Sequence, residues 1–176
     1  PLFNVNYKFQ FDAVFAAWPL LLKGTWITVQ LSLTATLLGL VVAIFCAWGK
    51  TGGPGWLRFL INAYIEVIRN TPFLVQIFFI FFALPQMGLR LNPTTTAIVA
   101  LALNGGAYAI EIIRGGVDAV PKGQIEAGLA LGLRRSQIFR HIILKPALRA
   151  VYPSLTSQFI MLTLTTSVCT SIAAYE

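Results

Sequence analysis

The sequence has very few of the residues that build catalytic or metal-binding sites. Its 176 residues include one histidine, two cysteines and six carboxylates. They show no paired carboxylates, no metal-ligand spacing and no Ser/His/Asp set, so we predict neither catalytic residues nor a metal site. The two cysteines, Cys46 and Cys169, lie inside apolar runs, which indicates packing residues rather than a disulfide or a metal pair.

Charge is also scarce. Charged residues make up 11% of the chain and hydrophobic residues 57%, whereas roughly a quarter of an ordinary soluble domain is charged. The mean hydropathy is +0.76. This composition predicts an all-α integral membrane protein in contact with a lipid bilayer. The net charge of +7 then reflects cytoplasmic loops and anionic headgroups, and we expect no nucleic acid partner.

Four apolar stretches predict membrane spans, at about residues 24–48, 59–84, 94–113 and 150–175. We expect them to form one transmembrane domain, 24–176. The preceding segment, 1–23, is rich in aromatic residues and is expected to be external or interfacial.

The second and third stretches carry polar features. Glu66 and Arg69 can pair on one helix face. Pro72 interrupts the helix, and this could shape a translocation path or could be a simple bend. Near the end of the third stretch, Glu111 either touches a substrate path or pairs with Arg114 to order the following loop. The third stretch also offers small-residue faces for close helix packing: Ala102, Gly106 and Ile110, or Gly105 and Ala109.

A polar loop, 114–149, joins the third and fourth stretches. It holds seven of the thirteen Lys and Arg residues and the only histidine, His141. Positive charge predicts a cytoplasmic location for this loop and an external N-terminus. Its centre, 124–139, has the periodicity of one amphipathic helix, with small residues that let another protein approach the backbone. An ordinary surface helix is the plainer alternative.

The loop carries a motif: Glu126-Ala127-Gly128, then Gly132 six residues after the glutamate, then Ile142, Leu144 and Pro146. This run resembles the EAA loop of permease subunits in ABC importers, although Gly128 replaces an alanine and the proline comes one place late. The resemblance implies a coupling helix that docks on a separate ATPase. The coupling residues implied are Glu126, Ala127, Gly128, Gly132, Leu133, Arg134, Arg135 and Gln137.

Two further runs resemble the polar amino acid branch of these permeases. One is Arg69, Thr71, Pro72 and Leu74-Val75-Gln76, and the other is Tyr108 and Glu111 followed by Arg114-Gly115-Gly116. The resemblance implies a type I ABC importer transmembrane domain in the bacterial inner membrane, with a fifth span expected beyond Glu176. It also implies a second permease subunit, identical or homologous, an external solute-binding protein and a polar amino acid substrate. No cofactor is expected on this chain, since ATP and Mg would bind the partner ATPase.

Candidate residues for a substrate path are Asn104, Tyr108, Thr163 and Ser167 near the bilayer centre, together with Glu111 near the membrane boundary. Hydroxyl side chains at 156, 163, 167 and 170 lie broadly along one side of the fourth stretch and could line a path or bond a partner helix.

Three other functions remain open from the sequence. The chain could be an ABC importer permease for a different small polar solute. An ion-coupled amino acid carrier would need ionisable groups deep within its spans, and only Glu111 approaches this. A membrane scaffold without transport would leave the spacing of the docking loop unexplained.

Overall fold

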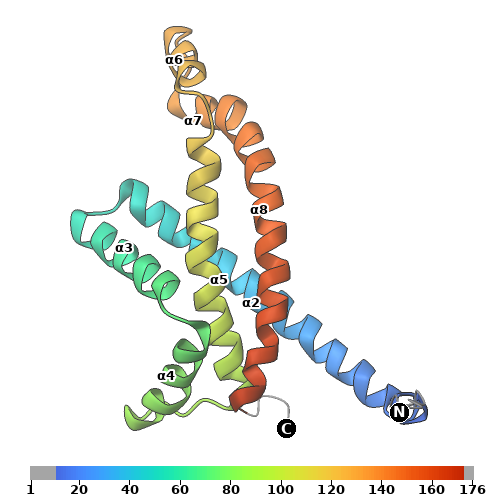
Figure 1. The fold of residues 1–176 in the computed structure, drawn as a ribbon. Coiled ribbons are helices and arrows are strands. Elements are labelled where there is room, and N and C mark those ends of the chain that lie inside the picture. The colour runs from blue at the N-terminus through green and yellow to red at the C-terminus, as the bar shows by residue number, and fades with distance from the viewer. Residues whose placement is uncertain (1–10, 173–176) are drawn as a thin grey trace, which may run out of the picture.

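The computed structural model describes residues 11–172, in which every regular element is a helix (Figure 1). This confirms the predicted all-α fold class. The aromatic residues Phe3, Tyr7 and Phe9 of the predicted interfacial segment, and Tyr175 of the fourth stretch, lie outside the described residues. The helices are α1 (Asp12–Ala16), α2 (Trp18–Gly52), α3 (Gly55–Asn70), α4 (Phe73–Gln86), α5 (Pro93–Asp118), α6 (Lys122–Ala130), α7 (Arg135–Ile138) and α8 (Leu144–Thr165). A π-helical turn, Phe139–Ile143, precedes α8, and a 3-10 segment, Thr166–Ile172, follows it.

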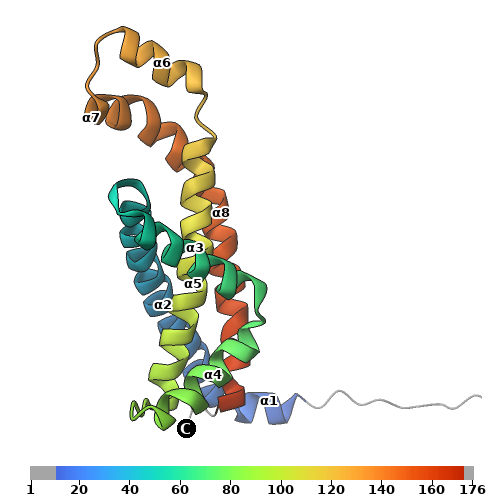
Figure 2. The same ribbon diagram turned by 90° about the vertical axis from the view of Figure 1, so that its left-hand side faces the viewer.

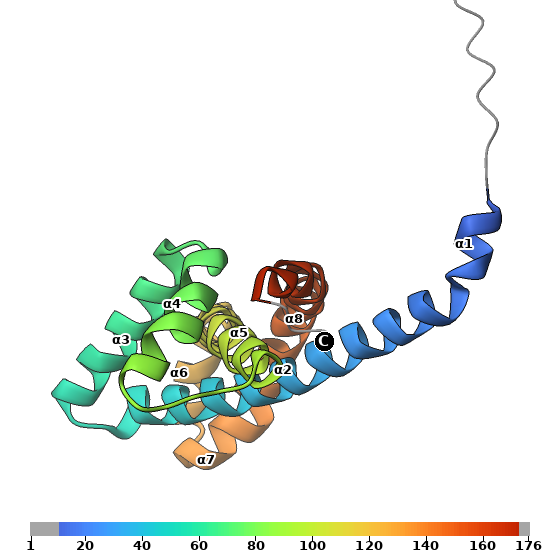
Figure 3. The ribbon, with the colours of Figure 1, turned by 90° about the horizontal axis from the view of Figure 1, so that it is seen from below.

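α5 is the central helix of the bundle. Seen from below, α3 and α4 lie on one side of α5, α8 lies on another, and the long α2 runs along a third side (Figure 3). Most of the buried apolar residues fall into two clusters along α5. One contains Leu31, Ile77, Leu101 and Leu162, and the other contains Ala43, Ile61, Ile65, Ala109 and Ile110.

Glycines let α2 and α8 approach α5 closely. A methyl group on Gly39 of α2 would lie 3.0 Å from Gly106 N and 3.1 Å from Ala102 O, so the two backbones are in contact. A methyl group on Gly105 would lie 2.7 Å from Leu162 Cδ1 of α8. These contacts confirm the two small-residue faces predicted for this helix. Sequence reasoning missed Gly39, which packs against the face formed by Ala102 and Gly106, because a single glycine in an apolar run has no distinctive spacing.

Within residues 11–172, three helices are long and apolar enough to cross a membrane. They are the apolar part of α2 (Trp18–Ala47), α5, and the helical run Arg135–Ile172 that contains α8. A fourth crossing is counted if the pair α3 and α4 is one span, and the helical axis bends by 112° between these two helices. The predicted interruption at Pro72 is therefore confirmed, and it is a sharp bend. α2 begins six residues before the predicted span because Pro19 is tolerated in its first turn.

The predicted single helix at 124–139 is wrong. α6 ends at Ala130 and α7 begins at Arg135, and the two lie at the end of the bundle beyond α5 and α8 (Figure 2). Gly132 causes the break, because its φ is +75°. It ends α6 in a Schellman motif, in which Gly132 N donates to Leu129 O and Leu133 N donates to Gly128 O. The Gln137 side chain then accepts from Arg134 N at 2.8 Å and caps α7.

α8 begins at Leu144, six residues before the predicted span, and Pro146 lies in its first turn. The preceding π-helical turn runs directly into α8, because Leu144 N donates to Phe139 O, and Pro146 is accommodated just after this junction without ending the helical run. The late proline of the motif therefore does not delay the helix.

Candidate functional site

The bend between α3 and α4 borders a polar pocket. This pocket has a volume of about 570 Å³ and lies among the bend, α5 and α8. Its polar lining comes from all three: Arg69, Asn70 and Thr71 at the bend, Asn104 and Tyr108 on α5, and Gln158 and Thr165 on α8. A pocket with this lining, bordered by three segments of an otherwise apolar bundle, can hold a polar solute of amino acid size.

The structure brings together only part of the predicted substrate path. Asn104 and Tyr108 line the pocket, whereas Thr163 and Ser167 do not. The hydroxyls of Thr163 and Ser167 donate instead to Phe159 O and Leu164 O of the same helical run, at 2.8 and 2.7 Å. A helix turns by about 100° per residue, so Thr163 lies almost opposite the lining residue Thr165.

Sequence reasoning missed the α8 residues that do line the pocket. Their positions, 158, 161, 162 and 165, share one helix face. The available signal was Gln158, the only amide side chain between Ala150 and Ile172. An amide in an uncharged stretch marks the polar side of a helix more reliably than hydroxyls, since hydroxyls can bond the carbonyls of their own helix.

Glu111 joins three helices through ion pairs. Its carboxylate lies 2.9 Å from Arg114 Nη2, 3.6 Å from Arg69 Nη1 of α3 and 4.0 Å from Lys50 Nζ of α2. The predicted pairing with Arg114 is thereby confirmed. Arg69 does not pair with Glu66 as expected; it reaches Glu111 and lies 5.5 Å from the ring centre of Tyr108.

A second polar pocket, of about 350 Å³, lies beside these ion pairs. Glu111 and Tyr108 line it from α5, and Asn62, Glu66, Arg69 and Asn70 line it from α3. Arg69, Asn70 and Tyr108 line both pockets. The polar lining therefore continues from the α3–α4 bend to the level of Glu111.

We predict that Glu111→Gln lowers the stability of the helix bundle by about 1 kcal/mol, a value close to that of a surface pair. The Arg114 side chain is 54% exposed and that of Glu111 only 20%, so solvent screens the pairs in part. Thermal unfolding of the detergent-solubilised protein should show a midpoint lower by roughly 2–4 °C.

The matched control is Glu66→Gln, which removes the same charge from an exposed side chain that forms no ion pair within residues 11–172. Equal midpoints for the two variants would contradict the bridging role of Glu111.

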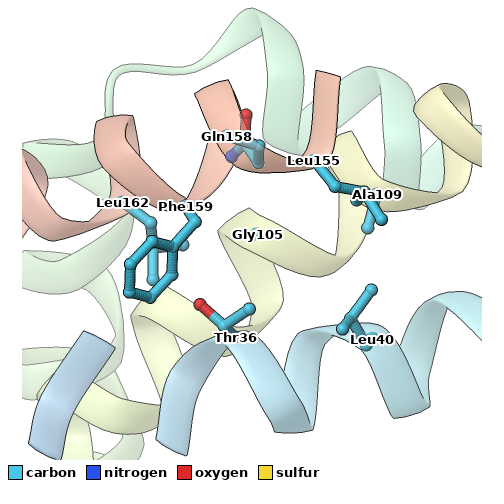
Figure 4. A pocket seen from close by; sticks show the side chains of 8 residues that line it. All are labelled: Thr36, Leu40, Gly105, Ala109, Leu155, Gln158, Phe159 and Leu162. Carbon is cyan, nitrogen blue, oxygen red and sulfur yellow. The ribbon is translucent and has the colours of Figure 1, made fainter. Parts of the chain in front are cut away.

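A small cavity of about 50 Å³ separates α2 from α8 beside α5 (Figure 4). Thr36 and Gln158 lie on opposite sides of it, on α2 and α8. The Thr36 hydroxyl is buried and has no hydrogen-bond partner among the described residues. Gln158 borders both this cavity and the larger pocket, so it forms part of the wall between them.

Most of the predicted coupling residues are exposed at the end of the bundle that carries α6 and α7. Glu126, Ala127 and Gly132 are exposed, as are Arg134, Arg135 and Gln137, and Leu133 is half-buried. Gly128 is the exception. It is buried, and a methyl group on it would lie 2.5 Å from Ile142 Cδ1, so it serves packing within the loop rather than approach by a partner.

The family of inner membrane components of binding-protein-dependent transport systems matches residues 35–176. The chain belongs to this family. It is accordingly a transport subunit and a multi-pass protein of the inner membrane. The match includes the α3–α4 bend, the pocket and the whole of the loop 114–149.

Named relatives of this inner membrane component are permeases. The glutamine transport system permease protein GlnP of Escherichia coli K12 is 43% identical over 157 residues, which are 88% of this chain and 71% of that protein. The L-cystine transport system permease protein TcyB of Bacillus subtilis strain 168 is 37% identical over 159 residues, which are 90% of this chain and 68% of that protein.

Solved structures have the same fold as this inner membrane component. A crystal structure of an amino acid ABC transporter with histidines has a TM-score of 0.89 at 32% identity, covering 95% of this chain and 78% of that one. The inward-facing MetNI methionine ABC transporter has a TM-score of 0.72 at 22% identity, over 90% and 77% of the two chains. The latter likeness concerns the fold alone. The architecture is that of a type I ABC importer transmembrane domain, as expected.

Proposed function

We propose that this chain is the permease subunit of an ATP-driven importer that carries a polar amino acid across the inner membrane. The observation that carries the proposal is the pocket of about 570 Å³ beside the α3–α4 bend. Its lining combines the guanidinium of Arg69 with the amides of Asn104 and Gln158, which suit the carboxylate and amine of an amino acid. The relatives named for glutamine and L-cystine transport support the same substrate class.

The proposed topology follows from charge and from the bend. α3 and α4 together make the second crossing, so that residues 24–176 form one transmembrane domain with four spans in this chain. The loop 114–149 is cytoplasmic because of its basic residues, and residues 1–23 are external. The ion pairs of Glu111 then lie toward the cytoplasmic side.

In this proposal, the loop 114–149 transmits the energy of ATP hydrolysis to the spans. A separate ATPase, which binds ATP and Mg, docks on the exposed residues of α6, α7 and the turn between them, chiefly Glu126, Ala127, Gly132 and Arg135. A second permease subunit and an external solute-binding protein complete the importer. Closure of the ATPase pair shifts α5 and α8, which carry two walls of the pocket, and so exposes the substrate alternately to the two sides.

The test is uptake of labelled amino acids by vesicles that contain the natural full-length permease with its co-purifying ATPase. We expect uptake of one polar group of amino acids with internal ATP and none without it. Uptake that persists without ATP under an ion gradient would identify an ion-coupled carrier instead. An ATPase that co-purifies while no amino acid enters would refute the substrate assignment and leave the coupling surface standing.

A further inference from the structure

One buried side chain, that of Gln76 in the first turn of α4, closes the bend between α3 and α4. It is 8% exposed. Its Nε2 lies 2.7 Å from Ile68 O and 2.9 Å from Thr71 O, and it also lies 2.8 Å from Thr71 Oγ1. Its Oε1 accepts a hydrogen bond of 3.0 Å from Asn104 Nδ2 on α5. Both ends of this amide are therefore engaged.

Pro72 explains why the bend needs this amide. In a continuous helix the N–H of residue 72 would donate to Ile68 O, but proline has no N–H. The backbone of α4 starts again with Val75 N and Gln76 N, which both donate to Pro72 O and so bypass Thr71 O. An unpaired buried carbonyl is costly. Gln76 Nε2 supplies a close donor to both carbonyls, whereas Thr71 Oγ1 reaches Ile68 O only at 3.5 Å.

These partners determine which way the Gln76 amide points. Backbone carbonyls only accept, so the NH₂ group must face Ile68 O and Thr71 O, and the oxygen must face α5. That oxygen also only accepts, which requires Asn104 to turn its own NH₂ group toward Gln76. Asn104 Oδ1 is then left for the pocket, and within residues 11–172 no group donates to it.

We propose that Gln76 is a positioning residue that sets the polarity of the pocket wall. Through Asn104 it presents a hydrogen-bond acceptor to the pocket, so that the wall selects a ligand group that donates N–H, an ammonium or an amide, over a carboxylate. Gln76 does not line the pocket and acts only through Asn104. This inference rests on the proposed function, because it specifies the substrate chemistry of the same pocket.

The experiment measures amino acid uptake for Gln76→Met, Asn104→Leu and the double variant, in the natural full-length permease with its ATPase. Methionine keeps the length of Gln76 but can neither donate to the bend nor orient Asn104. We expect Gln76→Met to raise the half-saturating substrate concentration roughly fivefold to tenfold, the loss of about one hydrogen bond. The maximal rate per inserted molecule should stay within about twofold, because the coupling surface is untouched.

The double variant carries the decisive comparison. If Gln76 acts through Asn104, adding Gln76→Met to Asn104→Leu should raise the half-saturating concentration by less than about a further twofold. The effects of two interacting residues are not additive. Gln30→Met is the matched control, because Gln30 is exposed on α2 and is not among the residues that line the pocket. The proposal would be overturned if the two single increases in half-saturating concentration multiplied in the double variant. It would also be overturned if Gln76→Met reduced the amount of active protein without changing the half-saturating concentration.

Hydrogen exchange of the α3–α4 bend separates this inference from the proposed function. Backbone amides at 73–78 should exchange faster in Gln76→Met than in Gln30→Met, because the bend loses its internal donor. If the wild-type permease takes up no amino acid, the proposed function fails, and exchange alone then decides whether Gln76 holds the bend. Unchanged exchange would overturn that role.

Discussion

Replacing Gly39 with leucine should prevent α2 from docking on α5 and cause the largest loss of stability of any single change considered. A methyl group at this position would already lie 3.0 Å from Gly106 N and 3.1 Å from Ala102 O. Both neighbours are backbone atoms of a central helix, so they cannot rotate away as a side chain could. We expect a loss of about 3 kcal/mol or more, the upper range for overpacking, with Gly39→Ala intermediate.

The measurement is thermal unfolding of the detergent-solubilised protein, together with the yield of folded material. A loss of about 3 kcal/mol should lower the midpoint by roughly 10 °C. Gly24→Leu is the matched control on the same helix, because no atom lies within 4 Å of a methyl group built there. Equal midpoints for Gly39→Leu and Gly24→Leu would show that the close crossing does not stabilise the bundle.

Replacing Gly132 with arginine should abolish uptake while the chain stays inserted in the membrane. Gly132 has a φ of +75° in the turn between α6 and α7, where a residue with a Cβ atom pays about 1–2 kcal/mol. No atom lies within 4 Å of a methyl group built on it. Arginine therefore projects from the exposed surface on which we propose that the ATPase docks, and it also strains the turn that sets α6 against α7.

Gly132→Asn separates the two effects, since asparagine tolerates positive φ and is small. It should retain most of the uptake. The readouts are ATP-dependent uptake, co-purification of the ATPase and the amount of inserted permease. Normal transport by Gly132→Arg would mean that this loop is not the coupling element. Equal inhibition by both variants would assign the effect to the glycine turn rather than to the docking surface.

The features that the sequence predicted well depend on local rules. Pro72 located the bend, because a proline removes one specific helical hydrogen bond wherever it lies. Glu111 and Arg114 were correctly paired because side chains three positions apart on a helix lie on the same face. Small residues on the third span indicated close packing, which Gly105 and Gly106 confirm.

The features that were wrong or missed depend on contacts between distant segments. Periodicity suggested one helix across Gly132, because it does not reveal that a glycine has positive φ. The pair Glu66 and Arg69 obeys the same spacing rule as Glu111 and Arg114, yet Arg69 pairs with a carboxylate 42 positions away in the chain. The hydroxyls of Thr163 and Ser167 bond their own helix, and the pocket wall is built by Gln158 instead.

α5 and α8 are held together at two separate heights, and this has a mechanical consequence. Gly105 faces Leu162 at one contact, and at the other a methyl group on Gly116 would overlap Val151. The contacts are 11 residues apart on both helices, or about 16 Å. Two such contacts prevent either helix from tilting alone, so the pair behaves as a rigid frame. α2 meets that frame at an oblique crossing around Gly39 (Figure 1). A force on the loop that joins α5 to α8 would therefore turn the frame as a whole, with the Gly39 crossing as its hinge.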